Sequence, residues 1–412
     1  MKSLWLTTNF LHPMNRGGKI RTYNILKEIY REDEVTYLGF DALIAGEEPL
    51  KRVAEYCSRA VAVTHREAER GQAAFFAQLV GNLFSSLPYS VAKLRSLQIE
   101  AKCEQELRHS DLDYLVCDFV HAAVNLPANL RIPSLLFQHN VEAVIWERLY
   151  QQQVSPLRRK YYEMQWRRMF NFERSACRRF DTVIAVSEND AKKMRTDYGL
   201  SHVTAIPTAV DTDYFRPDPD VMRDLNTLVF TGSLDWTPNI DGLRWFVDSV
   251  LPLVARAVPN VKLKVVGRNP RPDLLAAIKG RRGVELVGRV ADVRPHVQGA
   301  TASVVPLLVG GGTRMKIFES LALETPVVST TIGAEGLPLE PGKHILIADT
   351  PEDFARKTSK LLSDQAIGAA LGLEGGNYVR EKFGAATVAR EFASICHATV
   401  ERVRTARHIV QG

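Results

Sequence analysis

The chain lacks any long hydrophobic run, and no segment approaches the roughly 18 apolar residues that a membrane-spanning helix needs. Cysteine is also scarce. The five cysteines are scattered and show no CxxC spacing, which argues against a zinc site or a disulfide framework and indicates reduced thiols in a cytosolic protein. The first residues turn polar at Thr7 and Thr8, so a secretory signal is not expected.

The chain also lacks a strong excess of charge of either sign. The chain has 53 Lys and Arg against 47 Asp and Glu, a formal charge of +6. Because nucleic-acid-binding proteins usually carry a dense basic stripe, this small excess favours no nucleic acid partner.

Two common phosphate-binding motifs are missing. Without GxxxxGK[ST], a P-loop kinase or ATPase is disfavoured, and without GxGxxG after the first strand, a dinucleotide oxidoreductase is weakened. Three acidic triplets resemble a metal-binding DxD, but short triplets recur by chance, and we predict no metal site. They are Asp111-Leu112-Asp113, Asp211-Thr212-Asp213 and Asp218-Pro219-Asp220.

What the 412 residues do contain is a repeated rhythm of short β-branched runs and helix-length amphipathic segments. This alternation predicts parallel strands joined by helices, an α/β fold with doubly wound sheets. At roughly 100–200 residues per domain, two or three domains are expected. The expected strands are 4–7, 35–40, 60–63, 114–117, 134–137, 182–186, 228–230, 263–266, 284–287, 302–305, 326–328 and 345–347.

Composition also suggests where the domains end. Residues 206–225 are rich in proline and aspartate and predict a linker between a domain over 1–205 and another over 226–385. We expect residues 386–412 to form a C-terminal helix that packs back on the N-terminal domain. Two such α/β halves would face one another across a ligand cleft.

Two glycine-rich loops are candidates for binding phosphate. The first, Asn15–Lys19, contains Gly17 and Gly18 and opens a predicted helix, whose N-terminus favours an anion. A tight turn that binds nothing is an equal alternative. The second, Pro306–Glu319, has three glycines, with Arg314 and Lys316 at the start of a helix. Cations there oppose the helix dipole, so an anion such as a diphosphate is expected between them.

This second loop and the helix after it, Gly310–Thr330, resemble the signature of group 1 (family 4) glycosyltransferases, in an exopolysaccharide-type branch. Further segments agree, in the family's order. They are Phe230–Asn239, Gln138–Glu142, Val186–Asp190 and Ile206–Asp211. The resemblance implies a GT-B enzyme with two Rossmann-like domains, a donor held mainly by the C-terminal one, retention of anomeric configuration and no metal.

The resemblance also assigns roles to residues. Glu319 matches the second glutamate of the family's E-x7-E element and would bind the ribose, whereas Gly311 replaces the first glutamate. The family's diphosphate-binding Arg and Lys fall at Ser233 and Pro238, so we infer that the positive charge has moved to Arg314 and Lys316. The expected donor-binding residues are Gly17, Gly18, Gly232, Ser233, Gly311, Gly312, Thr313 and Glu319, and the expected catalytic ones are His139, Arg314 and Lys316.

His139 follows a predicted strand, where a functional and a structural histidine are equally expected. The resemblance places it near the anomeric carbon, in donor-sugar positioning and transition-state stabilisation. Asn140 and Glu142 are candidates for acceptor or sugar positioning. Glu142 could also simply begin the following helix.

A basic, aromatic segment spans residues 158–180. Its composition suits an interfacial membrane contact, but its basic residues are not confined to one helical face, which favours an ordinary packed helix.

The sequence therefore predicts a cytoplasmic enzyme, with peripheral contact to the inner face of the cell membrane as an alternative. It would transfer sugar from a nucleotide-diphosphate donor to a glycan or lipid-linked acceptor in polysaccharide biosynthesis, without a cofactor. The alternatives are a nucleotide-sugar epimerase or hydrolase of GT-B fold and a catalytically silent scaffold.

Overall fold

The computed structural model describes residues 1–14, 17–41, 49–65, 68, 71–109, 111–309 and 314–411. The chain divides into two compact units, Met1–Thr208 with Val388–Gly412, and Ala209–Thr387. The stretch 206–225, predicted as a linker, is thus divided between the units at Thr208.

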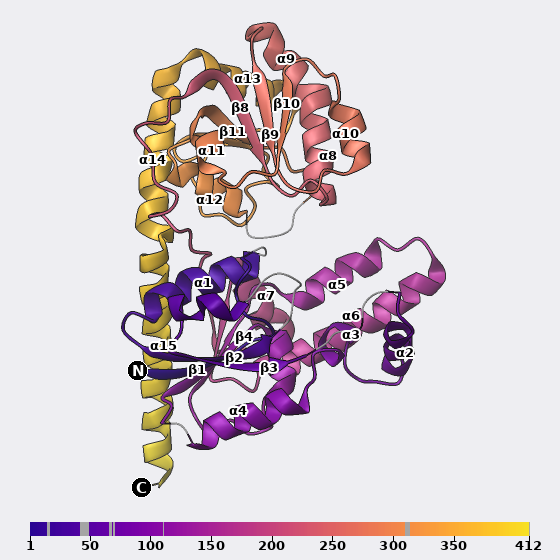
Figure 1. Cartoon of the computed structure of the whole chain (residues 1–412), viewed down its shortest axis with the longest axis vertical. Coiled ribbons are helices and arrows are strands. Elements are labelled where there is room, and N and C mark those ends of the chain that lie inside the picture. Colours follow the sequence, from indigo (N-terminus) through magenta and orange to yellow (C-terminus); the bar gives the residue numbers. More distant parts are fainter. Residues whose placement is uncertain are drawn as a thin grey trace. The chain divides into compact units, whose positions relative to one another are not determined.

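The first unit contains a parallel sheet, with the strand order β3-β2-β1-β4-β5-β6-β7 over the described residues (Figure 1). Strands β2 and β3 lie on one side of the central β1, and the chain then crosses to β4 on the other side, which makes the sheet doubly wound. The short β7 is the strand that the sequence did not predict. The strands are β1 (Lys2–Leu6), β2 (Glu34–Asp41), β3 (Arg59–Thr64), β4 (Tyr114–Asp118), β5 (Ser134–Phe137), β6 (Thr182–Ala185) and β7 (Val203–Ala205).

Helices connect these strands, and two of them, α5 and α6, form an antiparallel pair broken at Ser155-Pro156. Proline suits the first turn of α6 because its missing N–H would have no partner there. The helices are α1 (Gly17–Ile29), α2 (Ala73–Asn82), α3 (Tyr89–Ala92), α4 (Leu97–His109), α5 (Glu142–Gln151), α6 (Pro156–Cys177) and α7 (Glu188–Tyr198), with short 3-10 turns at Pro49–Glu55 and Val120–Asn125.

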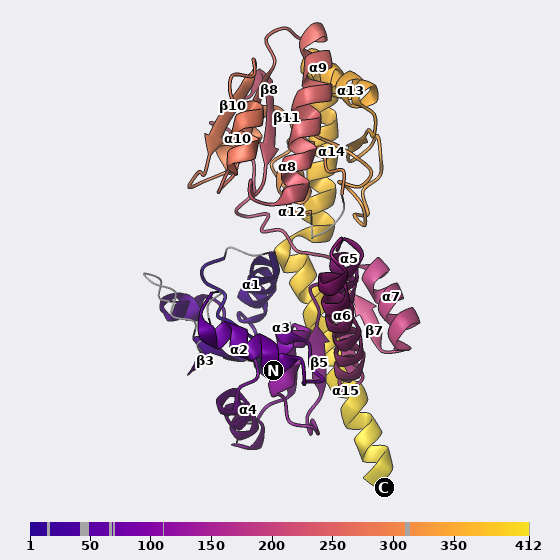
Figure 2. The same cartoon turned by 90° about the vertical axis from the view of Figure 1, so that its right-hand side faces the viewer.

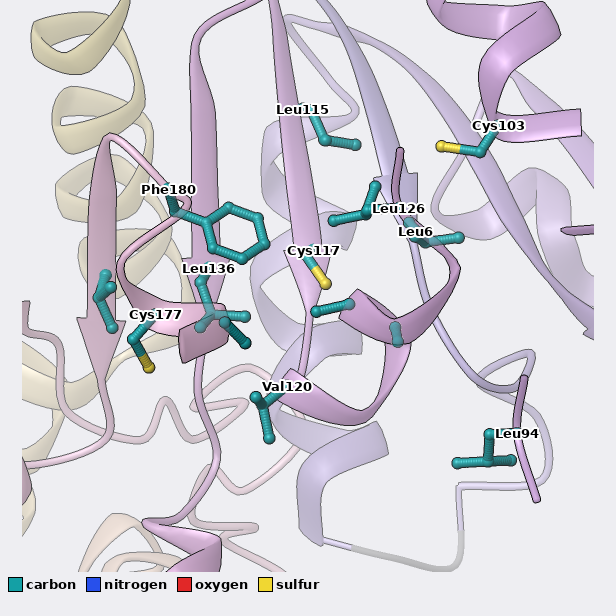
Figure 3. Close-up of a cluster of buried hydrophobic side chains, with 14 of the residues drawn as sticks. Leu6, Leu94, Cys103, Leu115, Cys117, Val120, Leu126, Leu136, Cys177 and Phe180 are labelled. Atoms are coloured by element: carbon teal, nitrogen blue, oxygen red, sulfur yellow. The ribbon is translucent and has the colours of Figure 1, made fainter. Parts of the chain in front are cut away.

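Figure 3 shows part of the core on one face of this sheet, where strand residues such as Leu115 and Leu136 meet residues of the covering helices. Cys103, Cys117 and Cys177 lie in this cluster. All five cysteines of the chain are buried free thiols, as expected, and burial raises the pKa of Cys103 to about 12.

The second unit repeats the plan in its described residues. Its parallel sheet has the order β10-β9-β8-β11-β12-β13. The strands are β8 (Asp224–Thr231), β9 (Lys262–Val266), β10 (Val284–Gly288), β11 (Ala300–Val305), β12 (Val327–Ser329) and β13 (Leu346–Ile347). The helices are α8 (Thr237–Trp245), α9 (Leu251–Ala257), α10 (Pro272–Ile278), α11 (Arg294–Gln298), α12 (Met315–Ala322), α13 (Pro351–Ser363) and α14 (Gln365–Phe383).

The stretch Asn239–Ala257 has the apolar spacing of one continuous helix, but the helix is interrupted. A π-helical segment, Phe246–Val250, separates α8 from α9. Pro252 in the first turn of α9 explains the interruption, because proline cannot donate to the carbonyl one turn earlier.

The last helix, α15 (Ala385–Gln411), completes the first unit (Figure 2). The ring of Phe392 stacks on Trp5 of β1, with 5.4 Å between centroids. The hydroxyl of Thr399 lies 2.8 Å from that of Thr182 at the start of β6. These contacts place α15 against β1 and β6 of the first unit's sheet.

Candidate functional site

In the second unit, the loop that leaves β8 approaches Lys316 of α12. The Lys316 Nζ donates to Asn239 Oδ1 at 3.0 Å and lies 4.7 Å from the centroid of the Phe230 ring. Asn239 also donates from Nδ2 to the Ser233 carbonyl at 2.9 Å. One amide therefore fixes both the lysine and the turn of the loop. The sequence did not single out Asn239.

Gly232 is required by this close approach. Its φ is 154°, and a Cβ there would lie 2.6 Å from Asn239 Nδ2 and 2.9 Å from Lys316 Nζ. Gly267, after β9, is under a similar constraint, because its Cβ would collide with the Gly232 carbonyl. The ends of β8 and β9 thus present bare backbone beside an ammonium group, which suits a bulky anion.

Lys316 and Glu319 have altered acidities. Burial, with a smaller contribution from the nearby Arg314 charge, lowers the pKa of Lys316 to about 7, while Glu319 opposes the shift. Burial likewise raises the pKa of Glu319 to about 7, against the pull of Lys316. Both groups therefore titrate near neutral pH, which makes the local charge sensitive to a bound anion.

Arg314 binds backbone. It is a buried residue with a left-handed conformation, φ 52°, immediately before α12. Its Nε donates to the Gly333 carbonyl at 3.1 Å and its Nη2 to the Ile332 carbonyl at 3.0 Å. These bonds hold the segment after β12, so Arg314 has a structural role besides the predicted one of diphosphate donor.

Of the remaining donor-binding candidates in the second unit, the structure describes only Ser233. Ser233 donates from Oγ to Asp235 at 2.6 Å, within the loop after β8. Gly311, Gly312 and Thr313 lie outside the described residues.

In the first unit, His139 follows β5 and meets the last residue of β4. Its Nε2 lies 2.7 Å from Asp118 Oδ1, and the Thr22 hydroxyl of α1 donates to Asp118 Oδ2 at 2.9 Å. Since an ionised carboxylate only accepts, Nε2 carries the proton and the lone pair of the neutral ring sits on Nδ1. That Nδ1 is buried and has no hydrogen-bond partner among the described residues. Sequence reasoning found His139 but neither of its partners.

One of the two predicted glycines, Gly18, lies beside this ring. Gly17 begins α1, and a Cβ on Gly18 would lie 3.5 Å from His139 Cγ. The structure thus brings together Gly18 and His139, which the sequence named separately.

Beneath His139, Arg21 of α1 is completely buried and contacts strand ends. Its guanidinium donates to the carbonyls of Gln138 at 2.6 Å and Ile206 at 2.8 Å, and lies over the Phe137 ring. Burial lowers the pKa of Arg21 to about 9, against the opposing charges of Asp118 and Asp190. Arg21 therefore holds the chain on which His139 sits.

Glu142 begins α5 and is mostly buried. Burial raises its pKa to about 7, and the neighbouring Glu173 adds to the shift, while a hydrogen bond from Asn140 opposes it. Its Oε2 lies 3.9 Å from Nε2 of His121, whose pKa is lowered by burial to about 4. At neutral pH, His121 is uncharged and Glu142 is poised to exchange a proton.

Glu173 of α6 supports this corner. It is fully buried and accepts from the backbone N–H groups of Glu142 at 3.0 Å and Ala143 at 2.9 Å. Gln138 and the Tyr198 hydroxyl also donate to it, at 2.8 and 2.7 Å. The carboxylate thereby caps α5 from another helix.

The acidic triplets serve ordinary structural roles. Asp113 accepts from the Lys2 amide, Asp211 from the Tyr214 amide and Asp218 from the Asp220 amide. Over the described part of the chain, no three His, Cys, Asp or Glu side chains gather as metal ligands would.

The aromatic residues of the basic segment pack locally. Trp166 of α6 stacks on Tyr150 of α5 at 5.7 Å, and Phe170 meets Tyr198 edge to face. These contacts favour the packed-helix interpretation of α6 itself. Within the described residues, no helix is long and apolar enough to cross a bilayer.

Known families match both units. A model described as "Glycosyltransferase Family 4" matches residues 76–214, and one described as "Glycosyl transferases group 1" matches residues 226–364. Together they cover more than half of the chain. The chain belongs to the group 1, family 4 glycosyltransferases.

Individual relatives of this glycosyltransferase are distant. A 44.6 kDa protein in the cps region of Klebsiella pneumoniae is 25% identical over 296 residues, 68% of this chain and 74% of that protein. A GDP-mannose-dependent alpha-(1-6)-phosphatidylinositol monomannoside mannosyltransferase of Mycobacterium tuberculosis is 25% identical over 259 residues, 56% of this chain. The match spans 66% of the mannosyltransferase, slightly less than two thirds of its length.

Solved structures share the fold. The Anabaena protein HepE, crystallised with UDP, superposes with a TM-score of 0.66 over 97% of this chain and 100% of that one, at 14% identity. The predicted GT-B class is confirmed.

Proposed function

We propose that this glycosyltransferase moves a sugar, with retention of configuration and without a metal, from a nucleotide-diphosphate donor to a glycan or lipid-linked acceptor. The second unit would hold the diphosphate and the ribose, and the first would position the sugar. The product would be a polysaccharide precursor made at the cytoplasmic side of the membrane.

The observation that carries the proposal is the position of Lys316. Its ammonium lies beside Gly232 and Asn239, in the loop after β8, where the family's usual cations fall on Ser233 and Pro238. A lysine on α12 therefore supplies charge to the loop that lacks its own. This geometry supports the inferred relocation of charge to Lys316. Arg314 would add a second donor to the diphosphate only through guanidinium N–H groups other than those that bind the Gly333 and Ile332 carbonyls.

The proposed step needs no covalent enzyme intermediate. The acceptor oxygen bonds to the anomeric carbon as the bond from that carbon to the β-phosphate oxygen breaks on the same face. The departing phosphate takes the acceptor's proton, so the products are a glycoside and a nucleoside diphosphate. Lys316 would stabilise the charge that develops on the phosphate, and His139 Nδ1 would accept a hydrogen bond from a hydroxyl of the donor sugar.

A screen of nucleotides and nucleotide sugars by thermal shift tests the donor class, because binding stabilises the fold without any acceptor. UDP and GDP sugars are the first candidates, since HepE was solved with UDP and the mycobacterial relative is named as GDP-mannose-dependent. No shift with any nucleoside diphosphate would refute the proposal.

Turnover separates the remaining alternatives. With the donor known, transfer to lipid-linked glycans should yield an α product from an α donor by NMR, at an unchanged rate in EDTA. Free sugar or an epimer formed without acceptor would indicate a hydrolase or epimerase. Donor binding with no turnover would indicate a catalytically silent scaffold. This outcome needs testing because Gly311 stands where the family has its first glutamate.

A further inference from the structure

An apolar helix lies exposed on the first unit. From Gly71 to Ala92 the sequence has no charged residue, although 24% of the chain is charged. Helix α2 lies in this stretch, and Asn82 is its only buried residue. Phe76 is 56% exposed, Val80 58%, Leu83 47% and Phe84 90%. A helix that is apolar on its outer side needs a partner that is itself apolar.

The C-terminal end of helix α2 is hydrogen-bonded to α6. Gln165 donates to Asn82 Oδ1 at 2.9 Å, and Arg168 donates to the carbonyls of Asn82 at 2.7 Å and Leu83 at 2.9 Å. The apolar side chains are therefore presented from a fixed support and not from a loose segment.

The beginning of α6 adds charge and further apolar surface. Val154 and Leu157, on either side of the α5–α6 turn, are 96% and 81% exposed. Arg158, Arg159 and Lys160 follow, all exposed, and none forms an ion pair among the described residues. The first turn of α6 has no acidic residue, so these cations face the positive end of the helix dipole without compensation.

We propose that α2 and the α5–α6 turn form a docking surface for an anionic phospholipid bilayer, hereafter the lipid face. Its members are Phe76, Val80, Leu83, Phe84, Val154, Leu157, Arg158, Arg159 and Lys160. The apolar side chains enter the acyl boundary and the cations meet lipid phosphates, which complement their charge. The 10 residues of α2 are too few to span a bilayer, so the helix lies along it.

The lipid face deepens the proposed function, because it would hold the enzyme where a lipid-linked acceptor resides. It also differs from the membrane alternative that the sequence offered. That alternative used the aromatic residues of 158–180, which pack against α5 and α7, whereas the exposed apolar residues lie on α2, just after it and in the α5–α6 turn.

Vesicle co-sedimentation of the full chain tests the proposal. We expect binding to vesicles of phosphatidylcholine with phosphatidylglycerol, and little to phosphatidylcholine alone. The double variant F76S/F84S should lower the bound fraction by about tenfold, because two aromatic side chains no longer enter the bilayer. The triple variant R158Q/R159Q/K160Q should bind as weakly at low salt as the wild type does at high salt.

Matched variants control for lost apolar surface and lost charge. Met222 is 89% exposed on the second unit, so M222S removes an equally exposed apolar side chain elsewhere. K279Q/R281Q/R282Q removes three exposed charges beyond α10. Both controls should bind vesicles as the wild type does.

Three results would overturn the lipid face. They are no binding to anionic vesicles, binding that F76S/F84S leaves unchanged, and a concentration-dependent dimer, seen by light scattering, that F76S/F84S abolishes. Thermal-shift binding of nucleoside diphosphates should be the same in all variants, so failure of the lipid face is distinguishable from failure of the proposed donor site.

Discussion

Lys316 should make nucleotide binding depend on pH. Its pKa is lowered by burial to about 7, so the ammonium form that attracts a diphosphate is lost as the pH rises through neutrality. A bound diphosphate favours the protonated form and raises this pKa, and binding above pH 7 must therefore take up a proton.

The size of the effect follows from the pKa. The protonated fraction falls from about half at pH 7 to about 3% at pH 8.5, which predicts about 15-fold weaker affinity for UDP or GDP over that interval. A phosphate with a second pKa of about 6 stays ionised throughout the interval and contributes little. Replacing the lysine with methionine removes a charged hydrogen bond of about 1.5–3 kcal/mol, or about 10- to 100-fold in affinity near pH 7.

Isothermal titration calorimetry in two buffers of different ionisation enthalpy measures both the affinity and the protons taken up. We expect K316M to bind weakly and with a pH profile shallower than that of the wild type, because only Glu319 of this pair is then left to titrate. In E319Q the midpoint should move to lower pH, because Glu319 normally raises the pKa of Lys316. If K316M keeps the wild-type slope, Lys316 is not the titrating group and its role at the diphosphate is refuted.

Three further predictions concern the groups that hold the site. D118N should lower kcat about 10- to 100-fold while leaving the affinity for nucleoside diphosphate unchanged, because Asp118 fixes the tautomer and orientation of His139; steady-state kinetics with a saturating donor measures this, and a changed diphosphate affinity would contradict it. N239A should weaken diphosphate binding severalfold with little effect on kcat, since Lys316 loses its anchor, and calorimetry should then show a Lys316 titration that persists. E173A should cost about 3–5 kcal/mol in urea unfolding, because four donors lose one buried acceptor, whereas a loss below about 1 kcal/mol would show that water replaces it.

Much of the strand pattern could be predicted because parallel strands buried on both faces read as short β-branched runs. Ser134–Phe137 was predicted with its observed bounds as β5. The three-residue β7 was missed because a strand that short leaves no periodic signal. Ser155-Pro156 marks the start of α6 in the sequence, because proline favours the first turn of a helix.

The candidate site was predictable only in part. His139 and Lys316 carry motif signals, whereas Asp118 and Asn239 acquire their roles from pairing. Asp118 ends a strand whose parallel register places it opposite Phe137, two residues before the histidine. That neighbour relation is a property of the sheet, and no spacing along the chain encodes it.

The closing contacts of α15 bear on how the protein is made. Phe392 covers Trp5, and Arg404 pairs with Asp113, so the first unit is completed by residues that are synthesised after the second unit. The second unit has all of its strands before that point. Synthesis of residues 1–208 alone would leave Trp5 without its stacking partner Phe392. To obtain the first unit by itself, α15 would have to be added as a separate peptide or joined to residues 1–208 in a circularly permuted chain.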